Sequence, residues 1–209
     1  QRSEKAHRKR KETKNQLKTQ KIKKRRFIIA ITLIIAIIAI VLFWQFGTTH
    51  FSTIYIRSDG SIDPSSSSIS ILDNNYYTLT ADIFGSIIIE RDDIVINGEN
   101  HRLYGEINKN STGIELKEIK NVTITNLKIE DFKYGIFIES GTSVKIIKNY
   151  LTNEYGVALD SSYYNTISEN NITNNYGGIL FAKSSNNTVT GNHLENNEYG
   201  LNLDYGSSN

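Results

Sequence analysis

The sequence predicts an all-β fold, a parallel β-helix with coils of about 22 residues, preceded by one N-terminal transmembrane α-helix. Three observations predict this architecture. Glycine recurs at intervals of 22, 21, 22 and 22 residues, at Gly113, Gly135, Gly156, Gly178 and Gly200. Apolar residues follow each of these glycines at one and three positions, as expected for short strands with one buried face. An uninterrupted apolar segment, residues 27–46, predicts the helix.

The basic residues of the chain are concentrated at its N-terminus. Residues 1–26 hold thirteen of the 24 lysines and arginines and only two acids. Residues 47–209 hold eleven basic and twenty acidic residues, a formal net charge of −9. This asymmetry indicates that the two parts of the chain meet different surroundings. We interpret residues 1–26 as a basic cytoplasmic tail beside anionic lipid head groups, and we expect no binding to nucleic acid.

Residues 27–46 are twenty residues without charge, glycine or proline. At about 1.5 Å per residue, a helix of this length spans the hydrocarbon core of a bilayer. The segment is apolar on every side, which argues against an ordinary core helix, and it is longer than the apolar region of a cleaved signal peptide. Lysine and arginine residues abut its N-terminal side and do not recur before Arg57. The positive-inside rule therefore predicts a single-pass membrane protein with residues 47–209 outside the cell.

Residues 47–112 are less regular than the rest of this outer part. Short strands are predicted at residues 53–57, 76–80, 86–90 and 93–97. Pro64 and the serines after it predict a loop. We interpret residues 47–112 as the N-terminal cap and first coils, which cover a sheet edge that would otherwise pair with other chains.

Residues 113–209 are predicted to be regular coils. Two further apolar columns share the spacing of the glycines: Ile124, Ile146, Ile167 and Val189, and Ile129, Leu151, Ile172 and Leu194. Equivalent residues of adjacent coils stack about 4.8 Å apart, which predicts ladders of asparagine side chains at the turns. The predicted ladders are Asn149–Asn170–Asn192 and Asn153–Asn174–Asn196. Because the chain lacks methionine and stops within a repeat, we expect the β-helix to be C-terminally incomplete.

Two runs make the repeat recognisable, NTISENNITNNYGGIL at 165–180 and NTVTGNHLENNEYGL at 187–201. Both resemble the NosD-type right-handed parallel β-helix repeat, and the lead-in at 53–64 and 87–98 looks like that of archaeal members. The resemblance covers roughly residues 53–209. It implies a pectin-lyase-like fold and its right-handedness. It implies function only broadly, because the family includes polysaccharide lyases, uronate epimerases and accessory proteins of nitrous oxide reductase maturation.

Few residues suggest catalysis or metal binding. The chain has no cysteine, which excludes disulfides, thiolate metal sites and a cysteine nucleophile. Glu139 and Asp160 follow the repeat glycine by four residues on adjacent coils and could share a cation. Since Ala182 interrupts their column, we interpret them as surface acids and expect no catalytic residue, metal or cofactor. Copper handling, an alternative implied by the resemblance, would depend on three scattered histidines in residues 47–209.

The outward-facing columns predict two candidate ligand-binding surfaces. One is rich in hydroxyl groups that could lie along a polysaccharide: Thr123, Thr125, Thr166, Ser168, Thr188 and Thr190. The other presents aromatic rings that could stack on sugars: Tyr134, Tyr155 and Tyr199. An apolar patch of Phe137, Ala158 and Leu180 is predicted across the middle coils of one face. The alternative interpretation is that threonine is simply favoured on exposed strands and that the tyrosines brace the corners.

Four sequons predict candidate N-glycosylation sites at Asn110, Asn121, Asn171 and Asn186. In a repeat rich in asparagine and threonine, many sequons arise by chance.

These observations predict a membrane-anchored extracellular β-helix domain that binds surface polysaccharide or other components of the cell envelope, including proteins. Three alternatives stay open. The first is a polysaccharide lyase, hydrolase or epimerase whose active site lies in further coils. The second is a structural surface scaffold, and the third is a NosD-like accessory protein. The residues present favour a role without catalysis.

Overall fold

The computed structural model describes residues 20–21, 23–25, 27–29, 31–38, 51–65, 68–106, 109–204 and 206–209. The chain divides into two units, residues 1–49 and 50–209. The described residues of the first unit are helical, and Thr32 Oγ1 donates to the carbonyl oxygen of Ile28, one turn earlier, at 2.8 Å. The predicted tail and the predicted membrane segment lie partly outside the described residues. Among those described, no helix combines the length and the apolar character needed to cross a membrane.

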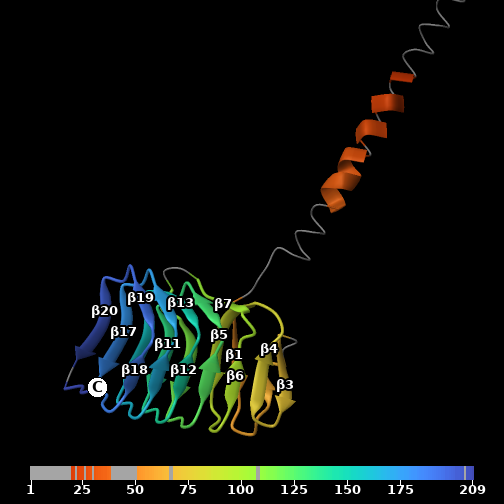
Figure 1. Ribbon diagram of the computed structural model, residues 1–209. Coiled ribbons are helices and arrows are strands. Elements are labelled where there is room, and N and C mark those ends of the chain that lie inside the picture. The colour runs from red at the N-terminus through yellow and green to blue at the C-terminus, as the bar shows by residue number, and fades with distance from the viewer. Residues whose placement is uncertain are drawn as a thin grey trace, which may run out of the picture. The chain divides into compact units, whose positions relative to one another are not determined.

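The second unit is a parallel β-helix in which every coil passes three faces (Figure 1). Face A contains β5 (Ile83–Ile89), β8 (Thr112–Lys117), β11 (Tyr134–Glu139), β14 (Tyr155–Asp160), β17 (Gly177–Ala182) and β20 (Tyr199–Asp204). Face B contains β6 (Val95–Asn97), β9 (Thr123–Thr125), β12 (Lys145–Ile147), β15 (Thr166–Ser168) and β18 (Thr188–Thr190). Face C contains β7 (Arg102–Tyr104), β10 (Lys128–Glu130), β13 (Tyr150–Thr152), β16 (Asn171–Thr173) and β19 (His193–Glu195). The predicted β-helix is therefore confirmed.

The N-terminal end carries the antiparallel pairs of this unit. β1 (Ser52–Ile56) pairs antiparallel with β2 (Ile62–Asp63) and parallel with β5. β3 (Ile69–Asp73) and β4 (Tyr76–Leu79) form a hairpin, and β4 continues face B by pairing with β6. Parallel stacking has begun by β5, β6 and β7, so residues 51–112 contain both a cap and the first coils.

The core consists of the predicted apolar columns. On face A, Ile136 and Ile138 align with Val157 and Leu159 of the next coil, and all four are at most 1 % exposed. The columns of faces B and C, such as Ile146 over Ile124, are buried in the same way. Because aligned residues repeat about every 4.8 Å, each side chain packs against its equivalents above and below. The core therefore runs the length of the solenoid.

The repeat glycines are required by the close approach of adjacent coils. A Cβ atom on Gly135 would lie 2.7 Å from the carbonyl oxygen of Gly156, and one on Gly156 would lie 2.7 Å from that of Gly178. Backbone atoms at this distance cannot turn aside as a flexible side chain can. The glycine column that reveals the period in the sequence is thus a packing constraint at the start of face A.

Buried polar ladders join the coils at each corner. Asn170 Oδ1 accepts a hydrogen bond from the backbone N–H of Asn149 at 2.8 Å, and Asn170 Nδ2 donates to the carbonyl oxygen of Ile146 at 2.8 Å. Asn192 repeats this pattern on Asn170, which confirms the first predicted ladder. Between faces A and B, two further ladders, absent from our expectations, follow the same pattern: Ser162–Ser184–Ser207 and Asn165–Asn187–Asn209.

The second predicted ladder was wrong by one residue. Asn153 is bonded to Asn175, and Asn175 is bonded to Asn197. The two asparagines assigned to this ladder from the sequence, Asn174 and Asn196, have left-handed backbone with φ of 59° and 54°. The corner containing Asn153 is one residue shorter than the corner of the next coil, which shifts the alignment. The preference of asparagine for left-handed backbone thus explains why asparagine occurs at positions 174 and 196, each next to a ladder member. It does not explain the ladder members themselves.

Substitution of Asn170 by alanine tests the ladders. The change leaves the N–H of Asn149 and the carbonyl of Ile146 without these partners, so we expect a loss in the free energy of unfolding of about 2–5 kcal/mol. The measurement is urea unfolding of the full chain followed by circular dichroism. Asn202→Ala, at an exposed outward position of β20, is the control and should cost less than about 0.5 kcal/mol. Equal losses for the two variants would contradict the assignment.

Two positions of the glycine column provide a matched test of coil spacing. Gly156→Ala forces a methyl group against the Gly178 carbonyl and should cost about 1–3 kcal/mol. In Gly200→Ala the nearest atom to the new methyl group, Leu194 Cδ1, lies 3.7 Å away, an ordinary contact, so the expected loss is small. Thermal unfolding of both full-length variants measures the difference. A Gly156→Ala variant as stable as Gly200→Ala would show that the coils can separate without cost.

Candidate functional site

A row of tyrosine rings follows the edge of face A where each coil arrives from face C. The rings of Tyr134 and Tyr155 are stacked, with centroids 5.2 Å apart and an interplanar angle of 22°. Tyr176 meets Tyr155 edge-on at 5.7 Å and Tyr199 at 5.4 Å. We call these four residues the tyrosine column. The structure therefore brings together the three tyrosines predicted from the sequence and adds a fourth, Tyr176.

Tyr176 was missed because its coil has two glycines in succession. Gly178 belongs to the repeat column, so the position that holds tyrosine in other coils is Gly177, which pairs with Tyr155. A Cβ atom on Gly177 would lie 2.7 Å from Cδ1 of Tyr155, so the Tyr155 ring lies where a side chain would stand. Tyr176 is displaced by one position and still reaches its neighbours. The Tyr-Gly-Gly run at residues 176–178, in which tyrosine precedes the repeat glycine by two positions instead of one, was the sequence signal for this displacement.

An apolar strip continues the tyrosine column across face A. Phe137 lies 5.4 Å from Tyr134, measured between ring centroids, and aligns with Ala158 and Leu180 on the next two coils. Ala158 points outward, yet it is only 2 % exposed, between its larger aligned neighbours. The predicted apolar patch is therefore present, and it forms a shallow surface beside the rings.

Burial and nearby charges raise the pKa of two hydroxyl groups of the column. Burial, followed by the nearby carboxylate of Glu154, raises the pKa of Tyr134, and the same two causes raise the pKa of Tyr155. Lys133 Nζ lies 5.2 Å from the centroid of the Tyr134 ring, a cation–π distance. Since an ordinary tyrosine already titrates near pH 10, these hydroxyl groups are neutral at physiological pH and can donate hydrogen bonds.

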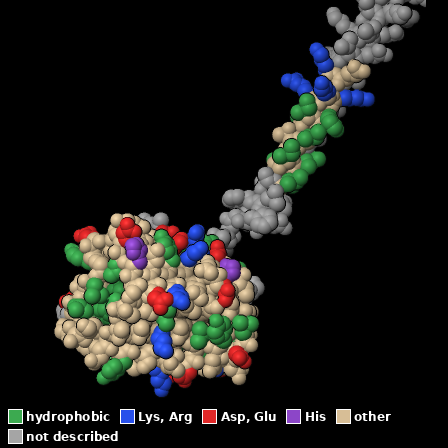
Figure 2. Space-filling view, in the orientation of Figure 1, with side chains coloured by type: hydrophobic (Ala, Val, Ile, Leu, Met, Phe, Trp, Pro, Cys, Tyr) green, Lys and Arg blue, Asp and Glu red, His purple; other side chains and the backbone are tan. Residues whose placement is uncertain are grey.

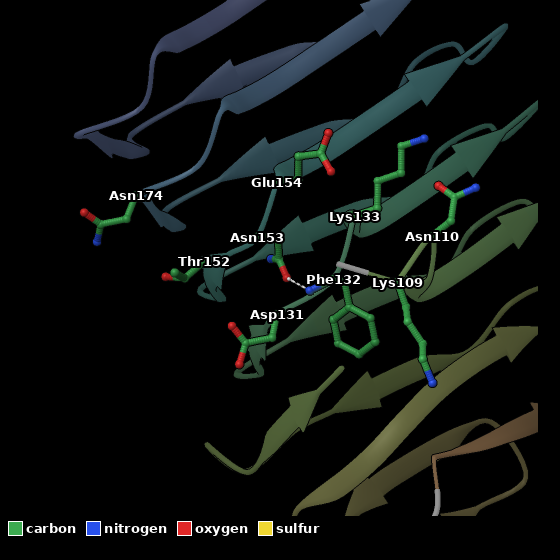
Figure 3. A pocket seen from close by; sticks show the side chains of 9 residues that line it. All are labelled: Lys109, Asn110, Asp131, Phe132, Lys133, Thr152, Asn153, Glu154 and Asn174. Carbon is green, nitrogen blue, oxygen red and sulfur yellow. Dashed lines mark hydrogen bonds between the residues drawn. The ribbon is translucent and has the colours of Figure 1, made fainter. Parts of the chain in front are cut away.

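An open hollow of about 530 Å³ lies beside the column, at the turns that lead from face C to face A (Figure 3). We call it the corner hollow. Its lining includes Asp131, Lys133, Glu154 and Asn174 from three successive turns, together with Asn110. The ladder bond from the N–H of Phe132 to Asn153 Oδ1, 3.1 Å long, fixes two of these turns. Pockets of this volume are typical of small-molecule and sugar sites.

A second hollow, of about 820 Å³, lies at the opposite ends of β5 and β8. Most charged groups around it are already paired. Glu90 binds Arg57 at 3.0 Å, Asp92 accepts from the backbone N–H of Lys120 at 2.9 Å, and Lys117 binds Glu139 at 3.2 Å. This hollow therefore offers few groups that could meet a ligand without breaking an internal contact.

The hydroxyl-rich surface lies on face B, apart from the tyrosine column on face A. Thr123, Lys145, Thr166 and Thr188 form one outward column. Thr125, Ile147, Ser168 and Thr190 form the other. The predicted alignments are present, but no single flat ligand can touch both sets of predicted residues. Lys145 and Ile147 interrupt the hydroxyl groups, whereas the rings of face A are continuous.

The two acids considered as a cation site are aligned, but each already has a partner within the protein. Glu139 and Asp160 are partners on β11 and β14. Lys117 pairs with Glu139, and Asp160 accepts a hydrogen bond from Ser161 Oγ at 2.9 Å. Within the part of the chain that the structure describes, no three histidine or acidic side chains gather around a point that could hold a metal ion.

The histidines expected to lie beyond the membrane do not converge. His101 Nδ1 lies 3.3 Å from Asp82 Oδ1, and His193 Nε2 lies 3.1 Å from Glu195 Oε2. His50 lies outside the described residues. Each described histidine thus meets a single carboxylate rather than a second histidine.

The four sequon asparagines occupy different environments. Asn110 and Asn186 are exposed, and Asn110 lines the corner hollow. Asn121 is also exposed, and its Nδ2 donates to Asp93 Oδ1 at 2.8 Å. Asn171 is half-buried on face C, and its Oδ1 has no hydrogen-bond partner among the described residues. Glycosylation at all four stays a prediction, and Asn110 and Asn186 are the most accessible acceptors.

Figure 2 shows one face of this unit, on which acidic, basic and hydrophobic side chains are interspersed among other residues.

A family model described as right handed beta helix region matches residues 52–209. The match begins at the first residue of β1 and includes every strand described above. Comparisons with curated proteins and with solved structures gave no match.

Proposed function

The chain belongs to the right-handed β-helix family, and on that premise we propose that its coils form a rigid platform on which face A binds a neutral glycan of the cell surface or envelope. The tyrosine column is the observation that carries this proposal. Aromatic rings bury large areas with few rotatable bonds and stack well on flat apolar surfaces. A pyranose ring presents such a surface on one side and hydroxyl groups around its edge.

The spacing of the column suits a linear polymer. Equivalent positions recur every coil, about 4.8 Å along the axis, so a repeating ligand aligned with the axis meets a similar ring at each step. The apolar strip of Phe137, Ala158 and Leu180 supports the same ligand from the side. Since β-sheet side chains here are held by neighbours above and below, the platform requires little ordering when it binds.

Electrostatics favours a neutral glycan over an acidic one. Residues 47–209 carry a formal net charge of −9. Burial and then Glu154 raise the pKa of Tyr134, and Tyr199 and then Glu198 raise the pKa of Tyr176, so two carboxylates act on the tyrosine column. A polyuronate would meet repulsion along its whole length. The same argument, together with the pairing of Glu139 and Lys117, favours binding over a lyase or epimerase acting on acidic polysaccharide.

The finer family assignment also belongs to the proposal. We propose a NosD-type member of archaeal type because of the two repeat runs at 165–180 and 187–201. A copper-handling role receives no support from His101 and His193, since each is engaged with one carboxylate. A purely structural scaffold would not need an exposed row of aromatic rings.

We further propose that residues 27–46 anchor the platform in a membrane, with residues 1–26 in the cytoplasm and the β-helix outside. The support is the twenty-residue apolar sequence and the basic residues beside it. An anchored platform would hold the bound glycan close to the cell surface.

Replacing Tyr155 by alanine tests the glycan proposal. The substitution removes the ring that stacks on Tyr134 and covers Gly177, so we expect a loss of affinity of about tenfold or more for any glycan the full chain binds. The measurement is a neutral-glycan array followed by calorimetry on the best binder. Tyr163→Ala removes an exposed tyrosine between faces A and B and should leave the affinity unchanged. Binding that both variants retain in full would place the ligand elsewhere, and the absence of any glycan binding by the unaltered chain would refute the function.

A membrane flotation assay tests the anchor. The full chain should remain with vesicles after an alkaline wash, whereas Ile35→Arg/Ile37→Arg should be released, because each charge near the middle of a span costs about 2.5–3.5 kcal/mol. Ile71→Arg, at an exposed apolar position of β3, is the matched control and should float like the unaltered chain. Release of the unaltered chain would disprove the anchor without bearing on glycan binding.

A further inference from the structure

We infer that the corner hollow is a subsite for the acetamido group of an N-acetylated amino sugar within the glycan bound on face A. The inference rests on the proposed function, since the hollow serves as a selective extension of the tyrosine column. Nothing in the repeat pattern requires the hollow. It arises where the turns before β11 and β14 meet the segment before β8.

The hollow and the tyrosine column are continuous. Lys133 immediately precedes Tyr134, and Glu154 immediately precedes Tyr155. Because Tyr134 and Tyr155 are aligned partners, Lys133 and Glu154 stand one coil apart, about 4.8 Å along the axis. A sugar packed against the outward edges of these two stacked rings therefore lies beside an ammonium group and a carboxylate group.

Three charged groups at the hollow are not engaged in ion pairs. Among the residues that the structure describes, Asp131, Lys133 and Glu154 form no ion pair, in contrast to the paired groups around the second hollow. Lys133 Nζ is held 5.2 Å from the centroid of the Tyr134 ring, which places its ammonium group beside the column. Figure 3 shows the side chains of Lys133 and Glu154 extending to the same side of the turns, while Asp131 and Asn174 point to another side of the hollow. Charged groups without an ion-pair partner at the edge of a pocket can form hydrogen bonds to a ligand.

The mixture of signs favours a ligand group that both donates and accepts hydrogen bonds. A uronate carboxylate has no donor for Asp131 or Glu154, and a free ammonium group has no acceptor for Lys133 or Lys109. A ligand that meets both signs at neighbouring positions must both accept and donate hydrogen bonds without a net charge.

An acetamido group meets this requirement. Its carbonyl oxygen accepts from the Lys133 ammonium group, and its N–H donates to the Glu154 carboxylate. Both are charge-assisted hydrogen bonds, which are stronger than bonds between neutral groups. The carboxamides of Asn110 and Asn174 can meet the neighbouring hydroxyl groups. A plain hexose offers hydroxyl groups at these positions but lacks the paired carbonyl and N–H of the amide.

Four hexasaccharides test the inference on the full chain by calorimetry: N-acetylglucosamine hexamer, its fully deacetylated form, cellohexaose and hexagalacturonate. We expect the acetylated hexamer to bind about tenfold more tightly than cellohexaose, which corresponds to about 1.4 kcal/mol, and more tightly than its deacetylated form, which lacks the amide. Hexagalacturonate should bind more weakly than either neutral hexamer. In Lys133→Met/Glu154→Gln, the ratio of the two neutral affinities should fall to about one. Lys148→Met/Glu169→Gln, an exposed ion pair of 3.6 Å at the corner between faces B and C, is the matched control and should keep the tenfold ratio.

The outcomes separate this inference from the proposed function. A preference for the acetylated hexamer that survives in Lys133→Met/Glu154→Gln overturns the subsite, as does equal binding of the acetylated and deacetylated hexamers. Cellohexaose binding that depends on Tyr155, without any preference for acetylation, overturns the subsite and leaves the proposed function standing. Failure of all four hexamers to bind the unaltered chain overturns the subsite, and an empty neutral-glycan array then overturns the proposed function as well.

Discussion

The stacking of coils through buried polar ladders is the interaction on which the rest of this protein depends. A corner of a β-helix turns the backbone too sharply for strand pairing, so its N–H and C=O groups need other partners. Asn149, Asn165 and Asn170 meet this need by reaching back to the preceding coil with both ends of the carboxamide. Because every such bond joins two coils, the ladders fix the height and the register of each coil as well as satisfying the turn.

The alignment of the surface side chains follows from the register of the coils. The stack of Tyr134 on Tyr155 is possible because their strands are aligned residue by residue. The same alignment buries Ala158 between Phe137 and Leu180 and brings the turns of Lys133 and Glu154 together. The arrangement of side chains on face A, which we propose as a binding platform, is therefore a consequence of the core and the corners, and it needs no separate framework.

Much of the fold could be predicted from the sequence because the residues of each coil recur with a regular period. The glycine column and the apolar columns gave the coil, the strand positions and the inward faces, since identical environments select similar residues. Asn175 and Tyr176 were misassigned or missed because one corner differs by a residue, and spacing alone does not show whether a position is a ladder member or its left-handed neighbour. The corner hollow could not be predicted from the sequence, since most of its lining residues are ordinary polar residues, contributed by three turns and by the segment before β8.

The sequence by itself determined that residues 53–209 form a parallel β-helix and which residues of each regular strand face inward, because period and hydrophobic alternation are local properties. Only the tertiary structure decided which outward side chains contact one another. It added Tyr176 to the tyrosine column, paired Glu139 with Lys117, and left Lys133 and Glu154 without ion-pair partners among the described residues. The physical reason is that the distance between side chains of different coils depends on the geometry of the corners. The insertion or loss of a single residue changes the path of the backbone through a corner.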